Sequence, residues 1–343
     1  MQNQNSAQAL RGSACPKKVE AIRQVAAFAQ VRAHLLVAEL LPEGRQRGDE
    51  WWAKNPARAD RKAGSFSVNL TDGCWSDFAS GDRGGDLVSL AALVLHMSQS
   101  DAAAWIARRL GLDIPILEGR PGMPSEQLQR RLEKAAQEVA TKAERAAQQA
   151  QARQRAAAGR AITMWSEAFA ADVRHPYLMR KQVAPRGIRQ RGQDLLVPLY
   201  AEGLMVNLQR IDASGEKRFL PGGQVKGAYC PIGRPVPGAR LYLAEGWATA
   251  CTIHALTGCA VAAAMNAGNL KPVALAMKTK YPDAQLVIAG DDDRQTQGNP
   301  GRTAAMAAAL AAGAEVSFPE WPEDAPLALS DFNDLHVWSA GHE

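Results

Sequence analysis

From Arg240 onward, short apolar runs alternate regularly with helical segments, and this alternation limits the fold more than any other feature of the chain. Repeated strand-helix units favour a parallel sheet covered by helices, with ligands bound at the carboxyl ends of the strands. The predicted strands are 240–244, 260–264, 285–289 and 315–318, and the predicted helices are 248–256, 270–280 and 301–312. The sequence therefore predicts an α/β domain over residues 239–343.

Acidic residues follow two of these predicted strands directly. Glu245 comes after the first strand and is followed by Gly246, which permits a tight turn, whereas Asp291, Asp292 and Asp293 come after the third strand. Adjacent carboxylates are costly unless a cation neutralises them, and oxygen ligands favour Mg²⁺ or Mn²⁺ over zinc. We expect Asp291 and Asp293 to share a face, with Asp292 turned away. The alternative is a solvated acidic rim on an ordinary α/β domain.

A last acidic pair, Asp331 and Asp334, lies near the end of the chain. It either completes the metal site or caps the start of a helix. The order of Glu-Gly, Asp-x-Asp and a final Asp-containing motif resembles the Toprim domain shared by bacterial primases, topoisomerases and some nucleases. The resemblance implies that Glu245 acts as a general acid/base or as a further metal ligand, while Asp291 and Asp293 bind Mg²⁺ or Mn²⁺ for phosphoryl transfer.

The segment before this domain, residues 173–238, is predicted to be a small basic α+β module. Its apolar runs at 194–199, 204–208 and 217–220 are separated by turns and indicate an antiparallel sheet. Tyr177-Leu178-Met179-Arg180 resembles the segment that opens the polymerase core of bacterial replicative primases. Gln209 departs from that pattern, since a Gly is expected there, as does Pro221-Gly222-Gly223, which replaces an Asn-Ser ending. The resemblance implies phosphate contacts from Arg180, Lys181, Arg210, Lys217 and Arg218.

Residues 21–118 are predicted to form an N-terminal α+β domain. A helical pattern runs over 19–41, a hairpin joins 65–70 to 74–78 through Asp72-Gly73, and helices follow at 87–96 and 100–110. The hairpin and the following Gly84-Gly85-Asp86 resemble the zinc ribbon that precedes primase cores. The ligand positions are occupied by Asn55, Arg58, Asp77 or Phe78, and Gly81, so we expect a ribbon-like fold without zinc.

Basic and aromatic residues of this N-terminal domain are candidates for binding single-stranded DNA, because bases stack on aromatic rings and phosphates attract cations. The alternative places the tryptophans in the core, above all Trp75. The candidates are Arg58, Arg61, Lys62 and Arg83, with Trp51, Trp52 and Trp75.

Two further segments complete the predicted layout. Residues 119–172 are rich in Ala, Gln, Glu, Lys and Arg and are expected to form a long helical linker between modules. Residues 1–20 are expected to be a disordered tail. The N-terminus has no signal pattern and no apolar run is long enough to span a membrane, so a cytoplasmic location is expected.

The charge is unevenly distributed between the two halves of the chain. The net charge is +5, yet residues 241–343 contain 5 Lys and Arg against 12 Asp and Glu, a net of −7, which leaves +12 for residues 1–240. Such asymmetry is typical of a nucleic-acid-binding surface joined to a cation-binding pole. Two unrelated solvated faces are the alternative.

Together these features predict a DNA primase or primase-like enzyme that makes short RNA primers on single-stranded DNA from nucleoside triphosphates. The layout resembles primase-like proteins of phages, plasmids and integrative elements. A Toprim-type nuclease and a non-catalytic single-strand-binding replication protein are the alternatives. No GxxxxGK[ST] motif is present, so unwinding of DNA is expected to need a separate helicase partner.

Overall fold

The computed structural model describes residues 16–58, 64–77 and 80–342. The chain divides into two compact units, residues 1–148 and 149–343, and the division falls inside one long helix, α5 (Glu126–Ser166). Arg61, Lys62 and Phe78, named above as candidates, lie outside the described residues. Helix α1 begins at Pro16, so the last part of the expected tail 1–20 is helical.

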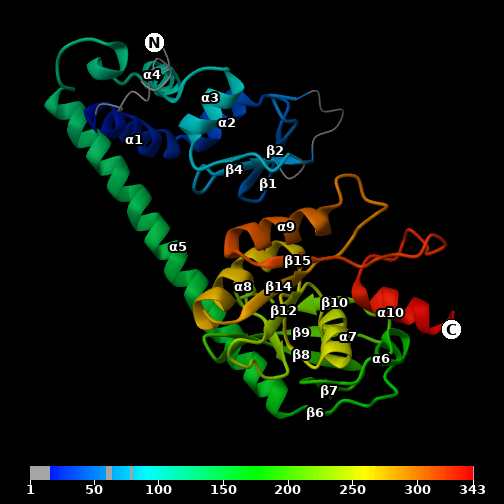
Figure 1. Ribbon diagram of the computed structural model, residues 1–343. Coiled ribbons are helices and arrows are strands. Elements are labelled where there is room, and N and C mark those ends of the chain that lie inside the picture. Colours follow the sequence, from blue (N-terminus) through cyan, green and yellow to red (C-terminus); the bar gives the residue numbers. More distant parts are fainter. Residues whose placement is uncertain (1–15, 59–63, 78–79, 343) are drawn as a thin grey trace, which may run out of the picture. The chain divides into compact units, whose positions relative to one another are not determined.

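Unit 1 contains an antiparallel five-stranded sheet in the order β1-β2-β3-β4-β5, with helices packed on one face (Figure 1). The hairpin predicted at 65–78 is β3–β4, and the helix predicted over 19–41 is two helices. The elements are α1 (Pro16–Gln30), α2 (Ala33–Leu40), β1 (Arg45–Arg47), β2 (Glu50–Ala53), β3 (Phe66–Asn69), β4 (Trp75–Asp77), β5 (Arg83–Gly84), α3 (Leu87–Val94), α4 (Gln99–Arg109) and η1 (Pro115–Glu118).

Helix α5 is anchored at both ends. Near its start, Leu128 and Leu132 are buried in the core of unit 1, and near its end Ala157 and Ala161 are buried within unit 2. Every residue from 140 to 156 is exposed. The alanine-rich composition predicted a helix here, and the apolar residues at its two ends explain how it joins two folded units.

Unit 2 begins with a second antiparallel five-stranded sheet, in the order β10-β9-β8-β7-β6. Strand β8 is buried on both faces, since Leu195 and Val197 pack on one side and Leu196 packs against the end of α5 on the other. The elements are β6 (Phe169–Ala170), α6 (Pro176–Lys181), β7 (Arg189–Arg191), β8 (Asp194–Ala201), β9 (Leu204–Ile211) and β10 (Lys217–Phe219).

The third sheet has the order β11-β13-β12-β14-β15 (Figure 1). Strands β12 to β15 are parallel, but β11 pairs with β13 in the antiparallel direction, so the expectation of a purely parallel sheet is corrected to a mixed sheet. The elements are β11 (Cys230–Ile232), β12 (Arg240–Ala244), α7 (Trp247–Thr257), β13 (Ala260–Ala263), α8 (Ala267–Lys280), β14 (Gln285–Ala289), α9 (Pro300–Ala312), β15 (Glu315–Ser317) and α10 (Phe332–Ala340).

Helix α7 lies between the two sheets of unit 2. Its buried residues, including Trp247 and Ile253, share one hydrophobic core with Leu195 of β8 and Val261 of β13. Helices α8 and α9 cover the other face of the third sheet, where Leu243 and Ile288 are buried. The segments 173–238 and 239–343 therefore fold around a common core. This core fixes the second sheet, β10-β9-β8-β7-β6, which we call the basic sheet, beside the ends of β12 and β14, where the acidic residues follow.

Within the described residues, no single helix is long and apolar enough to cross a membrane. Helices α3 and α4 meet the length and composition criterion only when taken together, and they are bent by 104° at the break between them.

Candidate active site

The acidic residues that follow β12 and β14 lie at one edge of the third sheet. The two strands are parallel neighbours, and Ala244, just before Glu245, pairs with Ala289. The carboxyl ends of these strands therefore meet, as the alternation of elements predicted. The backbone carbonyl of Glu245 also accepts a hydrogen bond from Met265 N–H at 2.7 Å, which fixes the turn beside β13.

The Asp291 carboxyl lies in a negative and largely buried environment. Its pKa is raised to about 8, mainly by burial, and the charges of Glu245, Asp331 and Asp293 add to this effect. Its Oδ1 atom is buried and has no hydrogen-bond partner. A buried carboxylate oxygen without a partner costs free energy, so this atom is available for a cation.

The pKa of Glu245 is raised in the same way. Burial is the largest cause, followed by the negative charge of Asp293. The positive charge of Lys217, on β10 of the neighbouring sheet, lowers the pKa of both Glu245 and Asp291. These charge effects indicate that the carboxylates after β12 and β14 and the lysine of β10 lie near one another.

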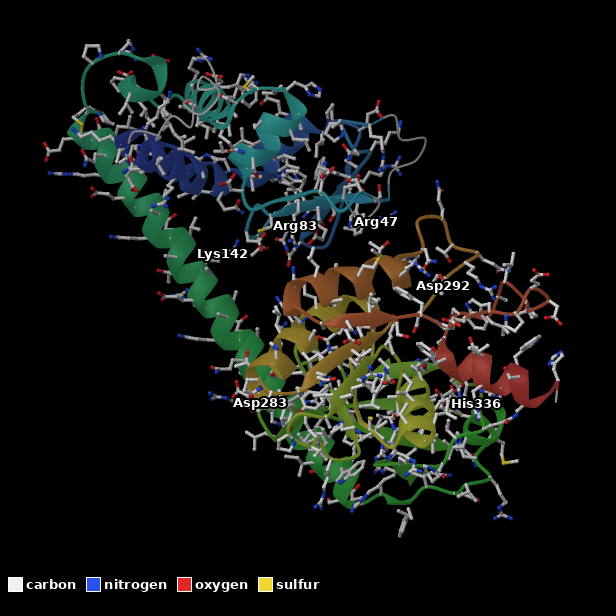
Figure 2. The ribbon with its side chains drawn as sticks, viewed as in Figure 1. Arg47, Arg83, Lys142, Asp283, Asp292 and His336 are labelled. Atoms are coloured by element: carbon white, nitrogen blue, oxygen red, sulfur yellow. The ribbon has the colours of Figure 1, made fainter. Side chains whose placement is uncertain are left out.

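The backbone after β14 presents its three aspartates in different directions. Asp293 Oδ2 accepts a hydrogen bond from Gly301 N–H at 2.8 Å, at the start of α9. Asp292 is buried and accepts hydrogen bonds from Asn299 Nδ2 at 2.7 Å and Arg302 Nη1 at 3.1 Å. Asp292, labelled in Figure 2, is thus engaged with α9.

Gly301 allows α9 to begin this close to the aspartates. A Cβ atom at this position would lie 2.8 Å from Asp293 Oδ2 and 2.9 Å from the Asp291 carbonyl oxygen. Such distances are shorter than atoms tolerate, so any larger residue would displace both aspartates. Sequence reasoning did not single out Gly301, although Asn299-Pro300 before a helix is a recognisable capping signal.

The two late aspartates have different environments. Asp331 is the N-cap of α10, where its side chain accepts from Asp334 N–H at 2.8 Å, and its Oδ2 accepts from Thr249 Oγ1 at 3.0 Å. Its charge also raises the pKa of Asp291, so it is both a helix cap and a neighbour of the acidic site. Asp334 instead forms an ion pair with Lys181 at 2.8 Å.

Among the described residues, no group of three or more His, Cys, Asp and Glu side chains is arranged as a ready metal cage. Mg²⁺ rarely uses such cages, because it usually keeps several waters and binds through one or two carboxylates and substrate phosphates. The oxygen-only donors and the unpartnered Oδ1 of Asp291 fit this mode of binding. The site thus suits Mg²⁺ delivered together with a phosphate ligand.

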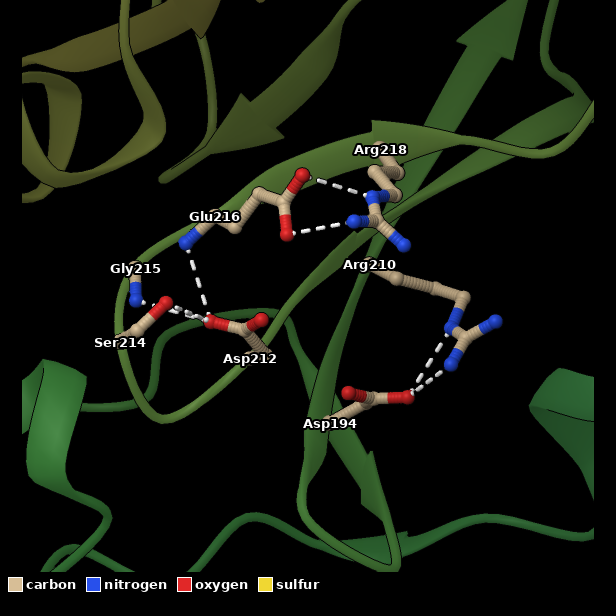
Figure 3. Close-up of polar contacts among 7 residues, drawn as sticks. All are labelled: Asp194, Arg210, Asp212, Ser214, Gly215, Glu216 and Arg218. Atoms are coloured by element: carbon tan, nitrogen blue, oxygen red, sulfur yellow. Dashed lines mark hydrogen bonds and ion pairs between the residues drawn. The ribbon is translucent and has the colours of Figure 1, made fainter.

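The predicted phosphate contacts of the basic sheet are mostly paired within the protein. Arg210 binds Asp194, and Arg218 donates to Glu216 Oε1 at 2.8 Å and Oε2 at 2.6 Å (Figure 3). Arg180 donates to the Ser214 carbonyl oxygen at 2.9 Å. Lys217 is exposed like these arginines, but it differs from them because its charge lowers the pKa of Glu245 and Asp291.

The residues of unit 1 that the sequence analysis expected at zinc-ligand positions include Asn55, Arg58 and Asp77, which are joined by polar contacts. Asp77 is buried and its Oδ2 accepts from Asn55 Nδ2 at 2.6 Å and lies 3.4 Å from Arg58 Nη1. Ser80 Oγ donates to the same oxygen at 3.1 Å. Hydrogen bonds and one ion pair therefore hold this part of the described fold together.

The tryptophans on the strands of unit 1 divide between the two faces of its sheet. Trp51 and Trp75 are buried in the core, where their indole N–H groups donate to Leu41 O at 3.2 Å and Ser89 Oγ at 2.9 Å. Trp52 lies on the opposite face and is half-buried. Trp52 is therefore placed to contact a ligand on the open face.

Strand pairing places a row of residues across this open face. Arg45 pairs with Trp52, Trp52 with Ser67, Ser67 with Ser76, and Ser76 with Arg83. Directly paired residues share a face, so an arginine lies at each end of a polar and aromatic row. Trp52, Ser67, Ser76 and Arg83 line a groove of about 670 Å³, and Figure 2 labels Arg83 and Arg47 on these strands.

Comparisons with known proteins identify the family to which the C-terminal domain belongs. Residues 240–341 match the Toprim domain family. Two curated Escherichia coli proteins, both named DNA primase TraC, are similar in sequence. The first is 32% identical over 260 residues, which cover 71% of this chain and 18% of that protein. The second is 43% identical over 138 residues, which cover 38% of this chain and 13% of that protein. The chain thus spans less than a fifth of the length of either relative.

Two solved structures are also similar. The zinc-binding and RNA polymerase domains of the Aquifex aeolicus primase match with a TM-score of 0.36 and 15% identity, over 94% of this chain and 82% of that one. The primase fragment of the bacteriophage T7 primase-helicase protein matches with a TM-score of 0.36 and 16% identity, over 52% of this chain and 74% of that one. The site geometry and the sequence matches together show that residues 240–341 form a Toprim domain, in a chain homologous to part of the DNA primase TraC.

Proposed function

We propose that this protein is a DNA primase, which synthesises short RNA primers on single-stranded DNA by Mg²⁺-dependent nucleotidyl transfer. The observation that supports this most strongly is the convergence of Glu245, Asp291 and Asp293, with a buried Asp291 oxygen that has no partner, beside a basic sheet. Phosphoryl transfer depends mainly on positioning and on neutralising charge, and this site offers both.

The metal ligands in this proposal are Asp291 and Asp293, with Glu245 and Asp331 as further candidates. A Mg²⁺ ion held by these carboxylates would supply the positive charge that polarises the reacting phosphate and stabilises the attacking and leaving oxygens. Asp334 contributes indirectly, because its ion pair with Lys181 and its bond to Ser330 N–H at 3.1 Å fix the start of α10. In the same way, Lys181 supports the site rather than a phosphate.

The chain's own residues have distinct roles in this chemistry. Burial and neighbouring charge raise the pKa of Glu245, which suits it to accept the proton of the attacking hydroxyl. Lys217 lies on β10, and its positive charge lowers the pKa of both Glu245 and Asp291. It is therefore placed near the carboxylates, and in this proposal it binds the triphosphate of the incoming nucleotide. Arg210 and Arg218 are exposed at the same sheet and would exchange their carboxylate partners for DNA phosphates.

We further propose that unit 1 is a zinc-free counterpart of a zinc ribbon and holds the template strand. The contacts of Asp77 with Asn55 and Arg58 supply the cohesion that a metal would give. Trp52 offers a stacking surface, and Arg45, Arg47 and Arg83 supply positive charge around it. Aromatic stacking and cationic grooves are the usual means of binding single strands.

The proposed substrates imply a setting for the protein. Single-stranded DNA and nucleoside triphosphates are both found in the cytoplasm, and the templates would be the replicating DNA of a mobile genetic element. A separate helicase would expose the template.

One experiment separates the candidate activities. The protein is incubated with single-stranded DNA, labelled ribonucleoside triphosphates and Mg²⁺, beside the variants Glu245→Gln and Asp291→Asn. A matched control is Asp283→Asn, at an exposed turn before β14 and so at the opposite end of the strand from the site. We expect new oligoribonucleotides from the wild type and from Asp283→Asn, and none from the two site variants.

The alternatives predict other outcomes. Shortened DNA that depends on Glu245 and Asp291 would indicate a Toprim nuclease. DNA binding with neither synthesis nor cleavage would indicate an accessory single-strand-binding protein, and either result would refute the proposed primase activity.

A further inference from the structure

The segment that leads to Asp331 has no helix or strand of its own. We define residues 319–330, between β15 and α10, as the strap. Asp331 follows the strap directly and contributes negative charge to the acidic site. The place of this carboxylate therefore depends on two sets of contacts: its own bonds with Asp334 N–H and Thr249 Oγ1, and the contacts that hold the strap.

One side chain ties the strap to the backbone that bears the other aspartates. Arg294 comes directly after Asp293, and its guanidinium lies 4.3 Å from the centre of the Trp321 ring. Its Nη2 donates to Pro326 O at 2.7 Å and to Leu329 O at 3.4 Å. Arginine suits this role because its planar group can stack on an aromatic ring and donate to carbonyl oxygens at the same time.

Further hydrogen bonds fix the end of the strap and the start of α10. Asp292 N–H donates to Ser330 O at 2.7 Å, which places the strap beside the Asp291–Asp293 backbone. Asn333 is fully buried and donates from Nδ2 to Lys181 O at 2.7 Å and Thr252 Oγ1 at 2.9 Å. Asp331 is therefore held from both sides, and Arg294 makes the side-chain contacts on the strap side.

We propose that Arg294 is a positioning residue for metal binding, which acts by holding the strap so that Asp331 stays beside Asp291 and Asp293. Its Nη2 donates to strap carbonyls and its guanidinium lies against Trp321, so its effect passes through the strap to Asp331. The inference rests on the proposed function, because it assumes a divalent cation at the carboxylates.

The test is a double-mutant cycle on cation affinity. Mn²⁺ binding to the full chain is measured by titration calorimetry for wild type, Arg294→Met, Asp331→Asn and the double variant. We expect Arg294→Met to weaken Mn²⁺ binding about tenfold, the lower end of the range for residues that orient metal ligands. In the Asp331→Asn background the same change should alter the affinity less than about twofold.

A matched control separates this role from the general loss of an arginine. Arg160 also donates to a proline carbonyl, Pro221 O at 2.8 Å, but on the far side of the basic sheet, at the end of α5. Arg160→Met should leave Mn²⁺ affinity unchanged. Arg294→Lys retains the charge near Trp321 and loses the Nη2 group that donates to Pro326 O and Leu329 O, so an intermediate affinity is expected.

Two results would overturn the role of Arg294. One is unchanged affinity in Arg294→Met, and the other is an equal loss with and without the Asp331 carboxylate, which would indicate a general disturbance of the fold. If Arg294→Met does not fold, Trp321→Leu removes the stacking partner and must show the same dependence on Asp331. A wild-type protein that does not bind Mn²⁺ would refute the proposed function instead.

Discussion

Replacing Asp291 by asparagine should stabilise the metal-free protein while removing its metal site. The structure places this carboxyl in a buried setting among other acids, which raises its pKa to about 8. An unfolded aspartate titrates near 3.9. Between these values the folded protein keeps a proton on Asp291 that the unfolded chain has already lost.

This difference fixes the sign and the size of the effect. The folded state binds the extra proton, so the free energy of unfolding of the wild type falls as the pH rises from about 4 to about 8, by about 1.4 kcal/mol per pH unit. The asparagine side chain does not titrate, so it makes no such contribution to the pH dependence of stability. From pH 5 to pH 8 the stability of Asp291→Asn should therefore rise relative to the wild type by about 4 kcal/mol, and the difference should level off above pH 8.

The assay is urea unfolding in the presence of a chelator at several pH values. Unfolding is followed by hydrogen exchange of peptides from β12 and β14. These peptides report on the stability of unit 2 alone, so that changes in unit 1 do not contribute. With excess Mg²⁺ at pH 8, only the wild type should gain stability, because only it binds the cation. A stability difference that does not change between pH 5 and pH 8 would show that Asp291 is ionised throughout and would refute the reasoning.

Three other substitutions test separate parts of the account. Gly301→Ala should weaken Mn²⁺ binding about tenfold or more by displacing the aspartates. The control Gly268→Ala, whose Cβ would lie 3.5 Å from its nearest neighbour, should leave Mn²⁺ binding unchanged. Equal Mn²⁺ affinities of the two variants in calorimetry would contradict this prediction. Asp77→Asn should lower the stability of unit 1 by about 3 kcal/mol, seen as faster hydrogen exchange in β3 and β4; unchanged exchange would argue against the polar network. Trp52→Leu should weaken single-stranded DNA binding about tenfold in an anisotropy titration. The control Leu35→Ala, at a residue 67% exposed elsewhere in unit 1, should leave DNA binding unchanged. An equal loss of DNA affinity in both variants would exclude a stacking role for Trp52.

The sequence predicted the third sheet best where apolar runs stand between helices. The strands expected at 240–244 and 285–289 are β12 and β14 with the same bounds. Strand β11 was missed, because Cys230-Pro231-Ile232 is short and pairs with a strand about thirty residues away. Local patterns do not reveal such distant antiparallel pairing, and this is why the mixed sheet was predicted to be parallel.

The faces of short strands were equally hard to assign. Trp51 and Trp52 are adjacent, and which of them enters the core depends on the register of β2 against β3. Trp51 is buried and Trp52 is on the open face, whereas the sequence favoured neither. Arg45 and Arg47 were missed as members of the open face, because β1 has no apolar alternation to mark it as a strand.

The sequence suggests the main residues of the acidic site, but it does not reveal the contacts that hold them in place. Carboxylates after apolar strands predict a cation site from local sequence alone, and the structure brings Glu245, Asp291 and Asp293 to one edge of the sheet. The pairing of Lys181 with Asp334 joins residues 153 positions apart, and the contacts of Arg294 with the strap reach 35 positions along the chain. Such contacts follow from packing, which one sequence does not show.

The sequence of the product tests the central claim most directly. The protein is given ATP and Mg²⁺ with either oligo(dT) or oligo(dA) as the single-stranded template, and the products of the wild type and Glu245→Gln are compared. The account predicts short oligo(A) made by the wild type on oligo(dT), none on oligo(dA), and none by Glu245→Gln. Equal product on both templates, or synthesis that survives the loss of the Glu245 carboxylate, would contradict template-directed synthesis at this site.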